Sequence, residues 1–461
     1  MKRKNRMGVY SVICAAALTL PLAACVGPMG PADDPDADPP NYTPPEQTAS
    51  QLLKYELNED ETGYVVTGLV DGATNATINI PDTYRDLPVT EIGERAFGSC
   101  RDVTSVRIGA NVTTIGSGAF TDCVGLPSFR FPDSIAVIGD SAFQNCTGLR
   151  AVYFNATSEL ESIESNAFQG CTALITANIP DSVVTIGDRV FQGCGALRSV
   201  TIGDGVESVG EEAFRGCEKL ATVTIGGSLK TIAERAFLDC TQITEIHFPD
   251  TLESVGLGAL SGCTGIKNIT LPFIGSEKYD TAVPESDEDS PDNHTNFGYI
   301  FGASSLRDHY KLELNNLETL TITGNSPIGY HAFQDIGRWT NADATRAQGL
   351  STIIITGNVK IIGTGAFASC RNLHTLVLPK SVASIGGQVL SDTLIETVYY
   401  CGTESEWNRI SDGGYANNMH LYGKNALGEA FMPDPRHFYT ETEPASGGNF
   451  WHYVDGKPTK W

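Results

Sequence analysis

The chain of 461 residues has no cluster of basic residues after position 6, and this absence limits its partners. It contains 31 Lys and Arg residues against 55 Asp and Glu residues, which gives a formal net charge of −24. Nucleic-acid phosphates and anionic lipid headgroups are bound mainly through Lys and Arg. We therefore expect no nucleic-acid partner.

Sequence patterns of common catalytic sites are also missing. No Gly-x-Ser-x-Gly, His-Glu-x-x-His or phosphate-binding-loop pattern occurs. No two of the eight His residues stand four positions apart, and each is expected to be a solvated side chain. We expect a protein that is not an enzyme, with no catalytic residue, no metal ligand and no cofactor.

Apolar runs of helical length are scarce, but one stands near the N-terminus. Residues 2–6 are mostly basic, and Val9 to Ala24 form a mostly apolar run of 16 residues that Pro21 interrupts. A bilayer span needs about 20 residues, so this run is typical of a signal peptide, over residues 1–24. Leu22-Ala23-Ala24-Cys25 resembles a bacterial lipobox. The resemblance implies cleavage before Cys25, lipidation of its thiol and a place on the outer side of a bacterial membrane.

The segment after Cys25 lacks the composition of a folded core. Residues 26–50 contain seven prolines and several acidic residues, and such a chain is extended, at about 3.1 Å per residue. Residues 25–50 are therefore predicted to be a lipid-anchored tether.

A repeat of 23 residues dominates the rest of the chain. Its pattern is Ile/Val-Gly-x-x-Ala-Phe-x-x-Cys-x-x-Leu-x-x-Val-x-Ile, and we name its aromatic position the Phe slot. The Phe slot is occupied by Phe97, Phe120, Phe143, Phe168, Phe191, Phe214, Phe237, Leu260, Phe333, Phe367 and Leu390. One unit of 23 residues cannot enclose its own apolar side chains, so about eleven units must stack.

The local pattern predicts how each unit folds. Val-x-Ile alternates with the period of a strand whose Val and Ile point inward, and a second short extended piece follows after a Pro-Asp or Gly-x turn. Residues 51–401 are thus predicted to form a mainly β solenoid with short strands on its faces.

Nine of the twelve cysteines occupy one position of the repeat, three residues after the Phe slot. They are Cys100, Cys123, Cys146, Cys171, Cys194, Cys217, Cys240, Cys263 and Cys370. Disulfides between rungs and a metal ladder are both conceivable, but metal sites usually need Cys-x-x-Cys pairs or added His. We favour a column of buried thiols that pack as small apolar side chains.

The repeat resembles the BspA-like, Treponema pallidum-type leucine-rich repeat of bacterial surface proteins, over residues 55–401, and this resemblance implies a right-handed solenoid of the leucine-rich-repeat type. Residues 273–326 interrupt the period, and Pro272-Phe273-Ile274-Gly275 is also similar to that family, so we interpret them as an elaborated rung with a long loop. The acidic run 285–293 within this insert lacks the glycine and spacing of an EF-hand, which favours a solvated loop over a calcium site.

The resemblance also covers residues 402–461, which are predicted to be a C-terminal cap and an aromatic tail. Tyr399 to Glu404 and Trp407 to Ile410 resemble the terminal cap of the family. Three of the four Trp residues lie in these last sixty positions. The segments that carry these aromatic residues are predicted to form a small strand pair packed onto the cap. The alternative is that their rings stack on sugars.

The outward strand positions are the predicted ligand face. Most are Ser or Thr, which suits a solvated sheet. Arg107, Arg130 and Tyr153 would stand in one row and suit an anionic or glycan ligand. Asn178 and His247 are further candidates on the same face.

The resemblance implies a monomeric surface protein that binds a protein or glycan ligand, in adhesion or contact with a host matrix. A structural spacer of the envelope is the first alternative. An enzyme with its site in the insert or the tail is the least favoured one.

Overall fold

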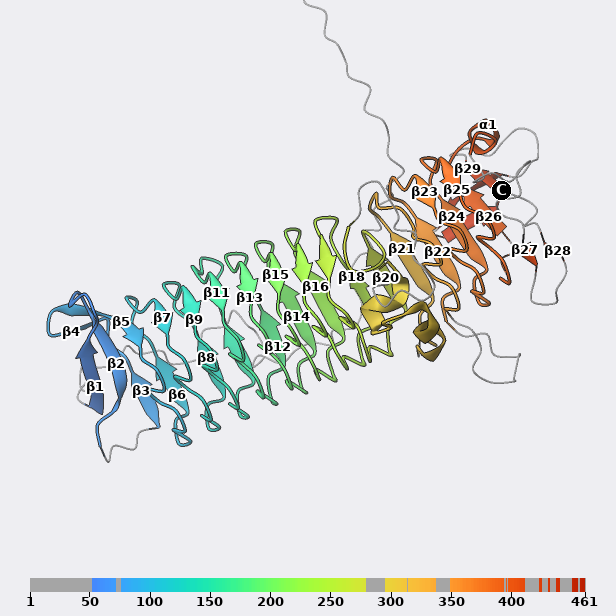
Figure 1. Ribbon diagram of the computed structural model, residues 1–461. Helices are drawn as coiled ribbons and strands as arrows, with labels where there is room; N and C mark the ends of the chain where they lie inside the picture. Colours follow the sequence, from blue (N-terminus) through green and yellow to red (C-terminus); the bar gives the residue numbers. More distant parts are fainter. Residues whose placement is uncertain are drawn as a thin grey trace, which may run out of the picture.

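The computed structural model describes residues 52–71, 76–278, 295–312, 314–336, 349–393, 395 and 397–410, and the strand residues 423–424, 430–431, 437–439, 450–454 and 457–460. These residues form an elongated, gently curved stack of short strands, with the N-terminal strands at one end and the C-terminal strands at the other (Figure 1). The predicted mainly β solenoid is confirmed.

One face of the stack, the long-strand face, consists of one Val-x-Ile strand per rung. Its strands are β3 (Thr77–Asn79), β6 (Ser105–Arg107), β8 (Ser128–Arg130), β10 (Ala151–Tyr153), β12 (Thr176–Asn178), β14 (Ser199–Ile202), β16 (Thr222–Ile225), β18 (Glu245–His247), β20 (Asn268–Leu271), β21 (Thr319–Ile322), β22 (Thr352–Ile355), β24 (Thr375–Leu378) and β26 (Thr397–Tyr400). They pair in parallel within three ladders, and β6 contacts β8, and β16 contacts β18, where the ladders meet. The sheet therefore includes two more rungs than the eleven Phe slots.

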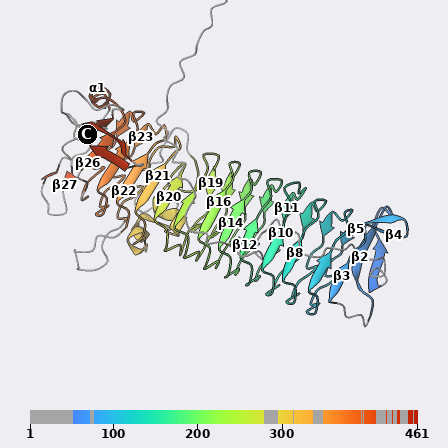
Figure 2. The same ribbon diagram turned by 180° about the vertical axis from the view of Figure 1, so that it is seen from behind.

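The other face, the short-strand face, consists of the extended piece that follows each turn (Figure 2). Its strands are β5 (Leu87–Ile92), β7 (Thr114–Ile115), β9 (Val137–Ile138), β11 (Ser162–Ile163), β13 (Thr185–Ile186), β15 (Ser208–Val209), β17 (Thr231–Ile232), β19 (Ser254–Val255), β23 (Ile361–Ile362) and β25 (Ser384–Ile385). At the N-terminal end, β1 (Leu53–Leu57) pairs antiparallel with β2 (Tyr64–Leu69), and β4 (Thr83–Tyr84) pairs antiparallel with β5. The β1–β2 hairpin closes the N-terminal end of the short-strand face.

The Phe slot forms the core between the two faces, and every residue in it is at most 1% exposed. From Phe97 to Phe237 the rings stack from rung to rung with centroids 5.0–5.4 Å apart. Burial of one such side chain stabilises by about 1.5–3 kcal/mol, and stacking adds about 0.5–1.5 kcal/mol.

The cysteine position is explained by a hydrogen bond that repeats along the solenoid. The thiol of Cys194 donates to the carbonyl of Phe168 in the preceding rung at 3.3 Å, and Cys217 donates to Phe191 at 3.2 Å. The same bond recurs at Cys123, Cys146, Cys171, Cys240, Cys263 and Cys370. Ten cysteines of the described part of the chain are free, and eight of these are buried. A column of buried thiols, as the sequence favours, is what the structure contains.

The insert takes part in the repeat. Strand β20 pairs directly with β21, with Asn268 opposite Thr319, so the long-strand face runs on across the insert. The 3-10 helix η2 (Phe297–Phe301) fills the place of the missing Phe-slot segment. The Gly258 N–H donates to the Tyr299 carbonyl at 2.9 Å, and the Phe297 N–H donates to the Ala332 carbonyl at 2.8 Å. A second 3-10 helix, η3 (Leu306–Lys311), follows it.

The C-terminal end closes in two ways. The helix α1 (Glu404–Trp407) carries a capping box between Thr403 and Glu406, and its Trp407 is buried against Tyr400. The tail contains the predicted strand pair, and β29 (His437–Tyr439), which pairs with β26, joins this pair to the long-strand sheet. Strands β30 (Phe450–Val454) and β31 (Lys457–Lys460) extend it further, and β27 (Gly423–Lys424) pairs with β28 (Ala430–Phe431).

The physical reason for this continuation is an apolar end of the outer face. Val377 and Tyr399 are outward residues of the long-strand face, and they would be exposed without a cover. Trp451 of β30 is fully buried against both, and its indole N–H donates to the Tyr400 carbonyl at 3.2 Å. Burial of these three side chains stabilises the added strands.

Candidate functional site

The strand register determines which side chains share a row on the long-strand face. In the pair β8–β10, Ser128 lies opposite Ala151, Phe129 opposite Val152 and Arg130 opposite Tyr153. Phe129 is buried in the core, so Arg130 and Tyr153 point outward from neighbouring strands.

Arg130 and Tyr153 contact each other. The guanidinium carbon of Arg130 lies 5.0 Å from the centroid of the Tyr153 ring, within the range of a cation–π interaction. Such a contact contributes about 0.5–1 kcal/mol at an exposed site and favours the arrangement in which the two side chains touch. The pair therefore presents a cation beside an aromatic ring.

Arg107 and Asn178 flank this pair. Arg107 ends β6, which contacts β8, and it stands opposite Asn79 of β3. Asn178 is exposed at the end of β12, and the pairing of Ala151 with Thr176 places it beside Tyr153. We name Arg107, Arg130, Tyr153 and Asn178 the Arg–Tyr row.

His247 occupies the equivalent outward position on its own strand but is remote from these four residues. It lies on β18, and strands β14 and β16 separate it from β12. One ring nitrogen, Nδ1, is 2.9 Å from Thr270 Oγ1 on the next strand. His247 is therefore no member of the Arg–Tyr row, although the sequence placed it on the correct face.

The remainder of the outward row differs in chemistry. Beyond Asn178 it continues through Thr201, Thr224, His247, Thr270 and Thr321 and then becomes apolar at Ile354, Val377 and Tyr399. Among the strands of this face that the structure describes, arginine beside an aromatic ring occurs in this row at β6–β10. The Arg–Tyr row is thus the part of the face suited to an anionic or glycan ligand.

The burial of one histidine contradicts the prediction that every histidine is a solvated side chain. His309 of η3 is 1% exposed, whereas the sequence indicated a solvated side chain. Its Nδ1 lies 2.7 Å from the Gln334 carbonyl, and its Nε2 lies 2.7 Å from Asn296 Oδ1. Burial lowers the pKa of His309, although the Gln334 contact and nearby aspartates oppose the shift. His309 joins the insert to the following rung, and no local sequence signal distinguishes it from a surface histidine.

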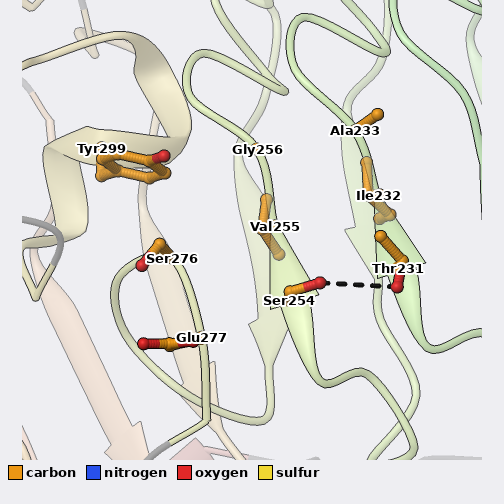
Figure 3. Close-up of a pocket in the computed structure, with 9 residues that line it drawn as sticks. All are labelled: Thr231, Ile232, Ala233, Ser254, Val255, Gly256, Ser276, Glu277 and Tyr299. Atoms are coloured by element: carbon orange, nitrogen blue, oxygen red, sulfur yellow. Dashed lines mark hydrogen bonds between the residues drawn. The ribbon is translucent and has the colours of Figure 1, made fainter.

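The insert also forms a pocket on the short-strand face, which the sequence did not indicate. An open depression of about 360 Å³ lies beside β17 and β19, and Ser276, Glu277 and Tyr299 of the insert complete its lining (Figure 3). Only the interruption of the period after Leu260 marks this region in the sequence.

Other predicted features lie outside the described residues, namely the signal peptide, Cys25, the tether and the acidic run 285–293. In the part of the chain that the structure describes, no group of three or more His, Cys, Asp or Glu side chains is arranged to hold a metal ion. Within that same part, no helix has the length and apolar character needed to cross a bilayer.

Three solved structures illustrate what the chain is similar to. A leucine-rich repeat protein from Bacteroides ovatus is 26% identical over 81% of this chain and 98% of its own, with a TM-score of 0.47. The Treponema pallidum leucine-rich repeat protein is 26% identical over 48% and 91%, with a TM-score of 0.40. A leucine-rich cell surface protein from Faecalibacterium prausnitzii is 24% identical over 83% and 100%, with a TM-score of 0.39.

No curated protein matches the chain. The family model of the BspA type leucine rich repeat region, in six copies, matches residues 75–194, 161–280 and 313–421. These ranges include most of the Phe slots and rungs described above. The chain therefore belongs to the BspA-type leucine-rich repeat family.

Proposed function

We propose that this protein is a non-enzymatic binding protein of the bacterial cell surface, which uses the Arg–Tyr row to hold an anionic protein or glycan ligand in adhesion or contact with a host matrix. A lipid on Cys25 anchors it to the membrane, and residues 26–50 extend the solenoid away from the surface. The family supports a repeat protein that makes interactions, and the lipobox supports the anchor.

The observation that carries the proposal is the contact between Arg130 and Tyr153 on adjacent strands. Arginine binds carboxylate and sulfate groups through two parallel hydrogen bonds, and a tyrosine ring packs against sugar or peptide surface at low entropic cost. The chain carries a net charge of −24, so a cationic row is a local reversal of its overall field.

The experiment compares bacteria that display the full chain with bacteria that display the combined variant Arg107→Ser, Arg130→Ser, Tyr153→Ser. Serine is chosen because it is small and polar and already occupies the other outward position of this face, at Ser105, Ser128 and Ser199. Cells are applied to arrays of matrix proteins and of sulfated and sialylated glycans. We expect at least a tenfold loss of binding, and weaker binding of the parent at higher salt, because the contacts are ionic.

The matched control carries Thr201→Ser, Thr224→Ser and Thr270→Ser on the same face and is expected to bind like the parent. If the arginine and tyrosine variant keeps all binding, the Arg–Tyr row is not the ligand site. If the parent binds nothing on either array, a structural spacer of the envelope becomes the better account.

The anchor has its own test. Metabolic labelling with an alkyne fatty acid is expected to label the parent and to leave the variant Cys25→Ala unlabelled and released from the membrane. Equal labelling of both proteins would show that Cys25 is not the modified residue.

A further inference from the structure

The short-strand face changes at β19, where the next parallel strand is missing. Instead, the insert returns alongside β19 in the antiparallel direction, with Ser254 opposite Glu277. The Val255 N–H donates to the Ser276 carbonyl at 2.7 Å, and the Lys278 N–H donates to the Glu253 carbonyl at 3.0 Å. This reversal opens the pocket of about 360 Å³, a volume at the small end of the range of ~300–1,000 Å³ for ligand pockets.

Tyr299 occupies a position that carries Ser, Asp or Glu in most of the preceding rungs and Leu257 in the rung next to it. Its carbonyl accepts from Gly258 as the Glu234 carbonyl accepts from Glu212 and the Glu211 carbonyl accepts from Arg189. The insert therefore places an aromatic ring where most of the preceding rungs carry a hydroxyl or a carboxylate. Figure 3 shows this ring on one side of the pocket, with Ser276 and Glu277 on the loop below it and β19 and β17 beside it.

The phenol of Tyr299 is neutral near pH 7, because the ordinary pKa of tyrosine is about 10. Burial, assisted by the nearby charge of Glu234, raises the pKa of Tyr299, although a backbone hydrogen bond with Leu257 opposes the shift. That bond also holds the phenol at the pocket edge. Tyr299 is half-buried, so part of its surface remains accessible to a ligand.

The remaining lining combines the apolar residues Ile232, Ala233 and Val255 with polar side chains, and none of the lining residues carries a positive charge. Glu277 supplies an exposed carboxylate, and Thr231, Ser254 and Ser276 supply hydroxyls. Thr231 and Ser254 are 3.4 Å apart and form a shared polar surface. The carboxylate of Glu277 disfavours an anionic ligand, and the hydroxyls disfavour a purely apolar one.

A cationic ligand and a neutral sugar remain as candidate ligands, and the hydroxyl groups of the pocket distinguish between these two classes. An ammonium or guanidinium group only donates hydrogen bonds, so it would leave the donor capacity of the Thr231 and Ser276 hydroxyls unused, while Ser254 already donates to Thr231. A sugar both donates and accepts, its vicinal hydroxyls match a carboxylate, and its apolar face packs against an aromatic ring.

We propose that the pocket binds one ring of a neutral saccharide, stacked against Tyr299 and hydrogen-bonded by Glu277 and the hydroxyls of β17 and β19. This site lies on the opposite sheet from the Arg–Tyr row, so it is a second binding site that does not depend on the proposed function above.

The test uses the full chain and a microarray of neutral oligosaccharides, namely glucans, mannans and N-acetylglucosamine oligomers, followed by calorimetry with the best binder. Tyr299→Ala is expected to weaken its binding about tenfold or more, and Tyr299→Phe, which keeps the ring, by much less. Glu277→Gln is expected to weaken it about fivefold with an unchanged thermal unfolding curve, because Glu277 is exposed. This second variant keeps the test valid if Tyr299→Ala disturbs the fold.

Two controls isolate the pocket. Thr185→Ala changes the residue equivalent to Thr231 on β13 and is expected to bind like the parent. Tyr153→Ala removes the aromatic residue of the Arg–Tyr row and is also expected to leave saccharide binding unchanged, which separates the two sites.

Three outcomes would overturn the proposal. The first is that no neutral oligosaccharide on the array binds the parent. The second is that binding survives both Tyr299→Ala and Glu277→Gln. The third is that a lysine-rich peptide, used as a cationic probe, binds through Tyr299 and Glu277 while the oligosaccharides do not.

Discussion

Two backbone positions in every rung have positive φ angles. One lies two residues before the Phe slot, as at Arg189 (φ 56°), and the other lies two residues after it, as at Asp239 (φ 62°). Glycine occupies some rungs, and Asp, Asn, Ser, Arg and other residues occupy the rest. A left-handed conformation costs an ordinary L-residue roughly 1–2 kcal/mol, so these positions store strain that the stacked core offsets.

Gly193 and Gly195 offer a matched test of that cost. Gly193 has φ +73° and Gly195 does not have a left-handed φ, yet a Cβ at either position would meet no atom within 4 Å. Gly193→Ala is expected to destabilise the protein by about 1 kcal/mol. Gly195→Ala is expected to be neutral or to stabilise by up to about 1 kcal/mol, because it restricts the unfolded chain. Urea unfolding followed by circular dichroism measures the stability of both variants. Equal effects of the two substitutions would refute the claim that the left-handed φ of Gly193 carries the cost.

Glu212 is a charged residue held inside the rim of the solenoid. Arg189 Nε donates to it at 3.1 Å, Arg215 Nη1 at 2.8 Å and Gln192 Nε2 at 3.0 Å. Burial opposes the ionisation of Glu212 most strongly, but the hydrogen bonds and charges of the two arginines together outweigh it and lower the pKa of this carboxyl. The ionised form is therefore more favourable in the folded chain than in the unfolded one.

This shift predicts a pH dependence. The unfolded pKa of Glu is about 4.3, so the contribution of Glu212 is fully present above about pH 5 and is lost as the pH falls through the lower folded pKa. Glu212→Gln is expected to lower stability at pH 7 and to reduce the loss between pH 5 and pH 3. Glu211→Gln is the control, since Glu211 is more exposed and lies 3.4 Å from Arg189. An identical pH profile for Glu212→Gln and the parent would contradict this role.

At the scale of the element, Trp451 determines whether the last strands stay paired with the long-strand sheet. Trp451→Ala removes the cover of Val377 and Tyr399. A buried Trp→Ala change costs about 3–5 kcal/mol, and in a repeat protein the effect stays near the altered rung. Hydrogen exchange should accelerate in β24 and β26 and remain unchanged in β12.

Trp451→Phe keeps an aromatic ring and should show a smaller effect in the same experiment. Uniform acceleration along the whole chain, or none at β24 and β26, would show that the tail does not protect this end.

Elements that repeat are predictable from the sequence, and elements that occur once are not. The two strands of each rung, the Phe slot and the thiol column follow from a period of 23 residues, because every rung repeats the same local constraint. The outward row that contains Arg130 and Tyr153 follows from strand alternation. The pocket around Tyr299, the burial of His309 and the cover supplied by Trp451 depend on contacts between distant segments, which no local pattern records.

At the scale of the whole molecule, two sheets enclose one continuous core and differ in what they present. The long-strand face offers cations and an aromatic ring near its N-terminal end, and the short-strand face offers an acidic, hydroxyl-lined pocket beside the insert. Each rung contacts its neighbours, so surface residues can change along the solenoid without altering the fold. This separation of core and surface allows one scaffold to carry more than one binding site.

The most direct test of the central claim is hydroxyl-radical footprinting of the protein with and without the ligand that the arrays identify. The Arg–Tyr row predicts that the ligand protects Tyr153 from oxidation while leaving the reactivity of Tyr299, on the other face, unchanged. Undiminished oxidation of Tyr153 at saturating ligand would contradict the claim that this row binds it.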